Sequence, residues 1–542
     1  MNIPYLHDFG GKKALMVNGQ PFLLLAGEVH NSNSSSVAYM EGVWDKAETL
    51  GMNSLLLPIT WELLEPEEGV FDFSLVDGLI EQARRRGKKL GLLWFGAWKN
   101  AQCYYAPAWV KTNLQRFKRA EVSKGVVYTR NEQFYGIPYT TLSYLCGETN
   151  EADARAFRAL MRHIKEMDER ENTVALVQVE NETGLMGAAR EHSDEADALF
   201  EAEVPAAFAA YMRGATATMA PDVRAAVEGG AAAGNWQAVF GDVAEEIFSA
   251  YHTAAYVGRV AAAGKEEYPL PMTANCWQEN GQQPGQYPSG GPVSRMMEVW
   301  RFCAPSIDVI TPDIYARDFC GACDAFTKLS NPLMIPETAT HSYAGPRQVW
   351  VVGHHHAMGY APFGFEEMGQ PFTAAASFLF GMDTQDPALK TPQNTEEYAW
   401  YTRTLQSMMP LLVNQYGSSS LQAVTSERKE EDTMLFGTFG FKAVMDTGAM
   451  SMGQASEAMK DGVCLVLQNT EDEFYIIANR CIILPFSTDA EKPNVDFLAL
   501  EEGCFENGNW TRIRRLNGDE ATLLGYDTPT LLRVKLFAYG KA

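Results

Sequence analysis

Short apolar runs and amphipathic helical stretches alternate along the first part of the chain. In one such stretch Leu75, Leu79 and Ala83 recur at helical spacing, and Gly51 and Gly87 each follow a helical stretch. The runs between the stretches are mostly apolar, which is typical of parallel strands covered by helices. We expect strands at residues 21–27, 54–57, 90–94, 173–179, 270–275, 307–315, 333–335 and 359–365.

This alternation predicts an α/β fold, a closed (β/α)8 TIM barrel, which we place at residues 1–370. The connections after the third and fourth strands are long for such a barrel. The alanine-rich segment 206–217 predicts that the second of these connections contains helices of its own.

The pattern changes after residue 417. Leu532, Val534 and Leu536 alternate with Arg533 and Lys535, and the runs 462–467 and 474–478 are bounded by turn residues. Short alternating strands without helices predict a C-terminal antiparallel β-sandwich or jelly roll at 418–542. Helical patterns at 374–380 and 396–412 predict a helical connector at 371–417 that packs on the barrel.

Composition excludes several classes of protein. Hydrophobic residues make up 46% of the 542 residues, enough for a sizeable core, so the chain is not disordered by composition. The net charge of −24 repels phosphate backbones and anionic lipids, so we expect neither a nucleic-acid nor a membrane partner. The 11 tryptophans, 22 tyrosines and 28 phenylalanines suit sugar stacking and a large core equally well.

Targeting and metal signals are weak. The N-terminal residues show neither a basic start nor an apolar run, and no stretch approaches the roughly 18 apolar residues of a membrane span. The 9 scattered cysteines fit a reducing compartment, so we expect a cytoplasmic protein. Cys320 and Cys323 form the one C-x-x-C pair, and His354, His355 and His356 are adjacent; we interpret neither group as a metal site.

Two predicted strands end in a glutamate. The fourth strand continues into Glu-Asn-Glu, ending at Glu182, and the seventh continues into Pro-Glu, ending at Glu337. The C-terminal ends of barrel strands carry the active site, so these side chains are expected at one rim. Two facing carboxylates suit glycoside cleavage, because one protonates the leaving oxygen while the other attacks the anomeric carbon or activates water. A solvated strand-end residue is the alternative interpretation of either glutamate alone.

The surrounding motifs resemble those of clan A retaining glycosidases, and within the clan those of the family 35 and family 42 β-galactosidases. Segment 176–182 (LVQVENE) is similar to the family 35 acid/base strand, although Thr183 stands where an aromatic residue is usual. Segment 61–73 (WELLEPEEGVFDF) resembles the segment after strand two, and 27–30 (GEVH) resembles Gly-Glu-Ile-His at the end of strand one. The resemblance covers about residues 10 to 370.

The resemblance implies a role for several residues. Glu182 is then the acid/base and Glu337 the nucleophile that forms a covalent glycosyl-enzyme. Asn181 is expected to hydrogen-bond the 2-hydroxyl of the sugar, and Tyr315 to donate to Glu337 and help keep it ionised. Further candidate sugar contacts are Glu28 and His30, with a rim salt bridge as the alternative, and Trp98 and Trp277, with core or lid packing as the alternative. Asn100 is a candidate hydrogen-bond partner of a sugar hydroxyl.

Two departures bear on the sugar. Asn31 to Asn33 replace the Tyr-Phe-Arg of family 35, and Lys99 and Asn100 lie where the family has a glutamate that helps read galactose. We expect a retaining exo-β-glycosidase that releases terminal β-D-galactosyl residues from a small oligosaccharide or glycoside, with no metal or cofactor. Alternatives are a β-glucosidase or β-glucan-oligosaccharide hydrolase or transglycosidase, and a non-catalytic carbohydrate-binding barrel. The sequence leaves open whether the protein forms a homo-oligomer.

Overall fold

The structure is a computed structural model that describes residues 3–131, 137–316, 318–371, 373, 391–445, 461–506, 508–518, 520 and 528–540. The chain forms two compact units. The first unit comprises Met1–Tyr5, Val29–Gly42 and Leu55–Ala316, and the second comprises Leu6–Glu28, Val43–Ser54 and Arg317–Ala542. The helix expected at 374–380 lies outside the described residues, and the boundaries 1–370, 371–417 and 418–542 stay predictions.

A nine-stranded sheet forms the expected (β/α)8 barrel, in the order β12-β14-β4-β5-β6-β9-β10-β11-β13. The two end strands, β12 and β13, are separated in sequence only by Pro336, so the order nearly closes on itself. Proline has no N–H for the ladder, which explains the split of the seventh strand. The strands are β4 (Leu24–Glu28), β5 (Ser54–Thr60), β6 (Lys89–Phe95), β9 (Val174–Val179), β10 (Met272–Trp277), β11 (Val309–Ile314), β12 (Met334–Ile335), β13 (Glu337–Thr338) and β14 (Gly359–Tyr360).

Within the first unit, β6, β9, β10 and β11 run parallel, with Leu92 opposite Val177 and Asn275 opposite Thr311. Every residue of β9 is buried, which accounts for its largely apolar sequence; Gln178 is its one polar residue. The long helices α5 (Gly147–Asp168) and α10 (Ala244–Glu267) pack closely together. A Cβ at Gly264 would lie 2.3 Å from the ring of Phe157, so only glycine permits this approach.

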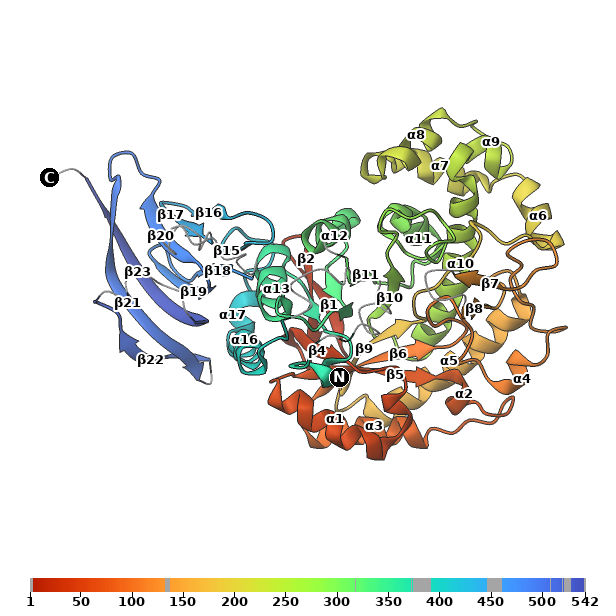
Figure 1. Ribbon diagram of the computed structural model, residues 1–542, viewed down its shortest axis with the longest axis horizontal. Helices are drawn as coiled ribbons and strands as arrows, with labels where there is room; N and C mark the ends of the chain where they lie inside the picture. Colours follow the sequence, from red (N-terminus) through yellow and green to blue (C-terminus); the bar gives the residue numbers. More distant parts are fainter. Residues whose placement is uncertain are drawn as a thin grey trace. The chain divides into compact units, whose positions relative to one another are not determined.

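The connection after β9 contains the extra helices that the alanine-rich sequence predicts: α6 (Asp194–Glu201), α7 (Ala206–Gly214), α8 (Pro221–Gly229) and α9 (Trp236–Phe240). They surround the start of α10 in the yellow and green part of Figure 1. Phe208 of α7 contacts the rings of Trp236 and Phe240, so aromatic packing holds the insertion together.

The last predicted strand is shorter than expected. The prediction covers 359–365, whereas β14 ends at Tyr360. Pro362 lacks an N–H, and Gly364 adopts a φ of 63°, so the chain turns instead of continuing the ladder. Phe363 keeps one bridge to Glu28, and Phe365 begins the short helix η8 (Phe365–Glu367).

The C-terminal part of the second unit is the expected antiparallel β-sandwich (blue in Figure 1). Its larger sheet has the order β15-β18-β19-β23-β21-β22 and its smaller sheet β16-β17-β20. Phe441 of the smaller sheet packs 4.9 Å from Phe474 of the larger, and Leu532, Val534 and Leu536 are fully buried in this core. The strands are β15 (Leu421–Thr425), β16 (Glu431–Phe436), β17 (Phe439–Val444), β18 (Val463–Gln468), β19 (Glu473–Asn479), β20 (Ile482–Ser487), β21 (Asn494–Glu506), β22 (Asn509–Arg515) and β23 (Thr530–Tyr539).

Shorter elements complete the described chain. None of its helices is both long enough and apolar enough to cross a membrane. The remaining strands and helices are β1 (Tyr5–Phe9), β2 (Lys12–Val17), β3 (Gln20–Phe22), α1 (Val37–Thr49), α2 (Trp61–Leu64), α3 (Ser74–Arg85), α4 (Ala108–Lys111), β7 (Thr129–Asn131), β8 (Ile137–Tyr139), α11 (Met297–Cys303), α12 (Phe319–Ala325), α13 (Ala344–Trp350), α16 (Thr395–Ser407) and α17 (Met409–Val413).

Candidate active site

Strand β9 ends in a tight turn at residues 180–182. Glu180 and Glu182 have φ angles of 61° and 44°, in the left-handed region that residues other than glycine rarely adopt. Glu180 and Asn181 are fully buried, and Glu182 is 7% exposed. Strained backbone of this kind persists only where the surroundings hold it, and it concentrates at functional sites.

Side chains from the next two strands hold Glu182. Its backbone N–H donates to Oδ1 of Asn275 over 3.0 Å, and Nδ2 of Asn275 donates to Oδ2 of Asp313 over 2.8 Å. Asn275 belongs to β10 and Asp313 to β11, and both are buried. Asn275 and Asp313 were not among the predicted site residues, although a polar residue inside each of two apolar strands was a readable signal.

Lys99 orients Asn181. The lysine is 6% exposed, its Nζ donates to Oδ1 of Asn181 over 2.9 Å, and it lies 5.0 Å from the ring centre of Phe95. The ammonium thus engages the amide oxygen of Asn181, and the N–H groups of the same amide are hydrogen-bond donors.

A buried carboxyl pair lies under the 180–182 turn. Glu180 accepts the backbone N–H groups of Ala97 at 3.2 Å and Trp98 at 2.8 Å. Asp153 of α5 accepts from Nε1 of Trp94 at 2.8 Å and from the hydroxyl of Tyr256 at 2.9 Å. Burial raises the pKa of both carboxyls, and the charge of Asp153 raises that of Glu180 further. Sequence reasoning missed Asp153, a charged residue on an otherwise buried helix face.

The other residues of the first unit that are predicted to contact the sugar are wholly or partly buried in that unit. Trp98 is 1% exposed and meets Tyr256 edge-on, with ring centres 4.7 Å apart. Trp277, half-buried, packs against Ala101, Tyr139 and Met186. Three further residues are half-buried: Tyr315 directly after β11, His30, and Asn100, whose buried Oδ1 has no hydrogen-bond partner among the described residues. The part of each in sugar binding stays a prediction.

The predicted carboxylates of the second unit also lie at strand ends. Glu28 is the last residue of β4 and is fully buried, and Glu337 begins β13 and is 4% exposed. The nucleophile role of Glu337 stays a prediction, as does the acid/base role of Glu182.

The segment 61–73 folds around one buried carboxylate. Glu65 accepts from Nε1 of Trp61 at 2.8 Å and from the N–H of Gly69 at 2.7 Å. Gly69 has a φ of 79°, which favours glycine at this position. The motif quoted for the family resemblance therefore builds a loop after β5.

The adjacent histidines lie in the second unit, at the short π-helix η7 (Val351–His355). Side-chain ligand atoms of Asp324, His354 and His355 lie within 4.8 Å of one another. Arg428, however, donates to Nε2 of His354 over 2.8 Å and pairs with Asp324, so a guanidinium supplies the positive charge of this cluster. Burial lowers the pKa of His355 to about 2 and that of His356 to about 4, so both are neutral at pH 7.

The C-x-x-C pair lies on α12. Cys320 and Cys323 are both buried, and all 9 cysteines of the chain are free thiols. Burial raises the pKa of the Cys320 thiol to about 12 and that of the Cys323 thiol well above its usual value, which makes both poor nucleophiles.

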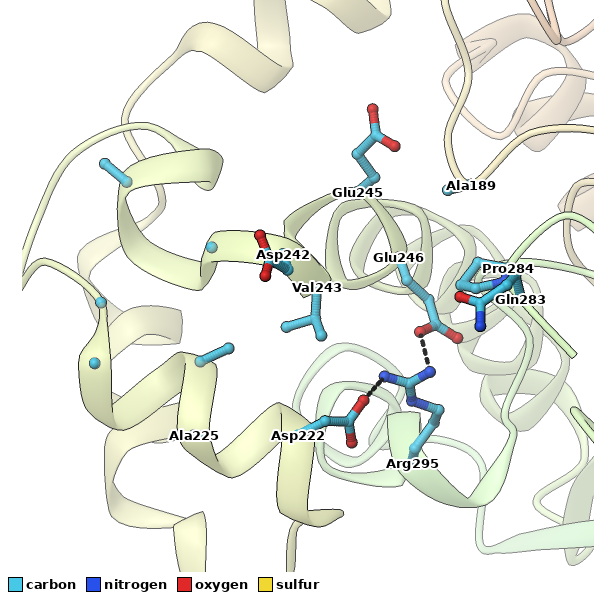
Figure 2. A pocket seen from close by; sticks show the side chains of 15 residues that line it. Ala189, Asp222, Ala225, Asp242, Val243, Glu245, Glu246, Gln283, Pro284 and Arg295 are labelled. Atoms are coloured by element: carbon cyan, nitrogen blue, oxygen red, sulfur yellow. Dashed lines mark hydrogen bonds and ion pairs between the residues drawn. The ribbon is translucent and has the colours of Figure 1, made fainter. Parts of the chain in front are cut away.

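A polar cavity of about 900 Å³ opens beside the helical insertion of the first unit (Figure 2). Arg295 pairs with Asp222 on one side and, over 3.3 Å, with Glu246 on the other. Glu246 is 2% exposed and also accepts from the hydroxyl of Tyr287, and burial raises its pKa despite the arginine. Asp242 and Glu245 add further carboxylates to the lining, which is otherwise largely alanine and glycine.

Comparison with known protein families supports the sequence resemblance over the N-terminal part. The sequence model of "Glycosyl hydrolases family 35" matches residues 14–93, which contain the segments 27–30 and 61–73. A second family, "Domain of unknown function (DUF5597)", matches residues 399–524. The resemblance to family 35 is confirmed for the matched residues.

Individual relatives match over limited parts. The β-galactosidase of Xanthomonas manihotis is 39% identical over 57 residues, which are 10% of this chain and 9% of that protein. The crystal structure of β-galactosidase from Bacillus circulans sp. alkalophilus is similar at a TM-score of 0.45 and 14% identity, covering 72% of this chain and 57% of that one. The exo-β-1,4-mannosidase Op5Man5 from Opitutaceae bacterium strain TAV5 is similar at a TM-score of 0.41 and 15% identity, covering 76% of this chain and 63% of that one. The chain thus spans less than two thirds of each of these proteins.

Proposed function

We propose that this protein is a glycoside hydrolase that releases terminal β-D-galactosyl residues with retention of configuration. The main support is the construction of the 180–182 turn, where a strained backbone held by the Asn275–Asp313 relay presents Glu182 at the end of a barrel strand. The family 35 match at residues 14–93 adds sequence support. Catalytic sites of barrels lie at such strand ends.

Glu182 is the acid/base in this proposal and Glu337 the nucleophile. Glu182 protonates the leaving oxygen while Glu337 attacks the anomeric carbon, which breaks the glycosidic bond and forms a glycosyl-enzyme. Glu182 then takes a proton from water, which attacks the same carbon and releases the sugar. The two carboxyls exchange every proton and charge that these steps need, so the proposal includes no metal or cofactor.

Neighbouring side chains position the sugar. Asn181, oriented by Lys99, donates an amide N–H to the 2-hydroxyl, a bond that strengthens in the transition state. Tyr315 donates to Glu337, and Glu28, His30, Trp98, Asn100 and Trp277 complete the proposed sugar pocket. The 9 free thiols favour a reducing compartment, so we propose that the enzyme acts in the cytoplasm.

A β-glucosidase is the second candidate, because Lys99 and Asn100 lie where the family pattern has a carboxylate. A panel of nitrophenyl β-galactoside, β-glucoside, β-fucoside and β-mannoside separates the two. We expect the highest kcat/KM for the β-galactoside and the β-fucoside, which share the axial 4-hydroxyl. A clear preference for the β-glucoside would replace the galactose assignment, and no turnover of any of the four would contradict the hydrolase itself.

The stereochemical course is a separate test. We expect proton NMR of the first sugar released from a β-glycoside to show the β-anomer before mutarotation, because double displacement restores the configuration. An initial α-anomer would contradict the retaining mechanism.

A further inference from the structure

Two carboxyl side chains, Asp153 of α5 and Glu180 after β9, meet in the interior of the first unit. Both are fully buried, and they hydrogen-bond to each other. A Cβ on Gly96 would lie 2.7 Å from Oδ1 of Asp153 and 2.7 Å from Oε1 of Glu180. Any other residue at position 96 would therefore collide with the pair, so the site is closely packed around these oxygens.

The donors around the pair are all neutral. They are the backbone N–H groups of Ala97 and Trp98, the indole N–H of Trp94 and the hydroxyl of Tyr256. Across the described ranges of the chain, no lysine, arginine or histidine forms an ion pair with either carboxyl. Two adjacent negative charges without a cation are strongly disfavoured in a buried site, so one of the two carboxyls retains a proton.

All four carboxyl oxygens of the pair accept a hydrogen bond. Asp153 accepts from ring donors, Oδ1 from Trp94 at 2.8 Å and Oδ2 from Tyr256 at 2.9 Å. Glu180 accepts from backbone N–H groups, Oε2 from Trp98 at 2.8 Å and Oε1 from Ala97 at 3.2 Å. The bond to Oε1 is the longest of the four, so a proton on this oxygen weakens the existing hydrogen bonds least, and Glu180 suits the role of donor.

We propose that Glu180 and Asp153 share one proton, held mainly by Glu180, and together act as a positioning pair for the 180–182 turn. This inference rests on the proposed function, in which Asn181 and Glu182 of that turn touch the substrate. The pair itself does not touch the sugar.

The pair connects the segments that carry the site. The main chain of Glu180 leads directly into Asn181 and Glu182, and its side chain fixes Ala97 and Trp98. Trp98 precedes Lys99, which donates to Asn181. Through Tyr256, Asp153 also ties α10 to α5. Loss of the shared proton at alkaline pH places two charges side by side, which we expect to displace the turn and lower turnover.

The surroundings of the pair offer one further titratable donor. Tyr256 faces it from α10, and burial, then the charges of the pair, raise the pKa of this tyrosine well above its usual value. The thiol of Cys146, directly before α5, acts electrostatically on Tyr256. Neither brings a positive charge, so the proton on Glu180 is what balances the pair.

Glu180→Gln and Glu180→Ala test the positioning role. The glutamine amide N–H donates to Asp153 at every pH, and its oxygen keeps the shorter bond from the N–H of Trp98 while the longer one from Ala97 is lost. We therefore expect most of kcat to remain and the alkaline loss of turnover to move to higher pH. Alanine removes the link, and we expect a fall in kcat of about 10²-fold with little change in KM, as for a displaced catalytic group. An unchanged alkaline limb in Glu180→Gln would overturn the proposal.

Two readouts do not depend on turnover. Above neutral pH, where Glu191 is ionised, infrared spectroscopy should show the carbonyl stretch of a buried protonated carboxyl in the native protein and not in Glu180→Gln. Above neutral pH, the thermal midpoint of the native protein should fall with pH more steeply than that of Glu180→Gln. Glu191→Gln, the same substitution at another buried glutamate, is the control that should keep this steep fall.

These measurements test the glycosidase activity and the shared proton separately. If no glycoside is cleaved, the proposed function fails, whereas the infrared band and the thermal midpoints still decide whether the pair holds a proton. A native protein without the band, or with the same pH dependence as Glu180→Gln, would overturn the shared proton even if the protein is an active glycosidase.

Discussion

The carboxyl pair under the 180–182 turn and the cavity beside α8 both collect acidic side chains in the first unit, but they balance the charge differently. Asp153 and Glu180 are surrounded by neutral N–H and O–H donors. In the cavity, Arg295 lies between Asp222 and Glu246 (Figure 2). A proton balances the first group and a guanidinium the second.

This difference determines how each region responds to change. A proton leaves as pH rises, so the pair under the turn is sensitive to alkaline conditions. A guanidinium stays charged throughout the accessible range, so the cavity is sensitive to removal of Arg295 itself. Burial alone therefore does not say what a carboxylate does; the donors around it do.

Removing the guanidinium is expected to have the largest effect on stability. Arg295→Met leaves Glu246, which is 2% exposed, without its cation, and breaking such a buried pair costs about 3–5 kcal/mol of unfolding free energy. Urea unfolding near neutral pH measures the loss. The loss should shrink at lower pH, because burial raises the pKa of Glu246 and protonation removes the stranded charge.

The double variant Arg295→Met/Glu246→Gln is the matched control, because it removes both charges. We expect it to recover much of the lost stability. An equal loss with and without Glu246 would mean that packing of Arg295, rather than its charge, stabilises the cavity.

The pH dependence of stability distinguishes two buried glutamates. A raised pKa in the folded state means that the native protein holds a proton that the unfolded chain releases. Unfolding free energy then falls by about 1.4 kcal/mol per pH unit, from the unfolded glutamate pKa near 4.3 up to the folded value. For Glu191, whose pKa burial raises to about 7, this fall ends near neutrality. Burial and the charge of Asp153 raise the pKa of Glu180 well above its usual value, and from the proposed shared proton we expect its fall to extend to higher pH.

The difference is measured by comparing the unfolding free energies of the native protein, Glu180→Gln and Glu191→Gln across this pH range. Relative to native, Glu191→Gln should gain stability with pH only up to about 7, and Glu180→Gln should keep gaining beyond it. If the unfolding free energies of the two variants changed with pH in the same way, Glu180 would behave as an isolated buried carboxyl and not as part of a pair that shares a proton.

The smallest effect is expected at the exposed end of the cavity. Asp222 is 58% exposed, so its pair with Arg295 is screened by water, and Asp222→Asn should cost no more than about 1 kcal/mol. Urea unfolding at low and high salt checks this, and the difference from native should diminish with added salt. A loss as large as that of Arg295→Met would place the stabilising partner of the arginine at Asp222 instead of Glu246.

The barrel and the sandwich were readable from the sequence because burial on both faces gives largely apolar strands, and burial on one face gives alternation. Glu182 was found because it ends the Glu-Asn-Glu segment after such a strand, in a motif that resembles the family 35 acid/base strand. Asp153 and Tyr256 were not predicted, because long-range packing of α5 and α10 brings them to Glu180 and no local sequence pattern indicates that contact. The alanine-rich insertion predicted helices, but the cavity depends on where Arg295 meets them.

The central claim is that Glu337 is the nucleophile and Glu182 the acid/base, and azide rescue of a dinitrophenyl β-galactoside tests both with one product analysis. In Glu337→Gly, azide enters from the vacated face, so proton NMR should show the α-galactosyl azide. In Glu182→Ala, azide replaces water in the second displacement and should give the β-galactosyl azide. Near-normal turnover of Glu337→Gly without azide, or the same anomer from both variants, would contradict the assignment.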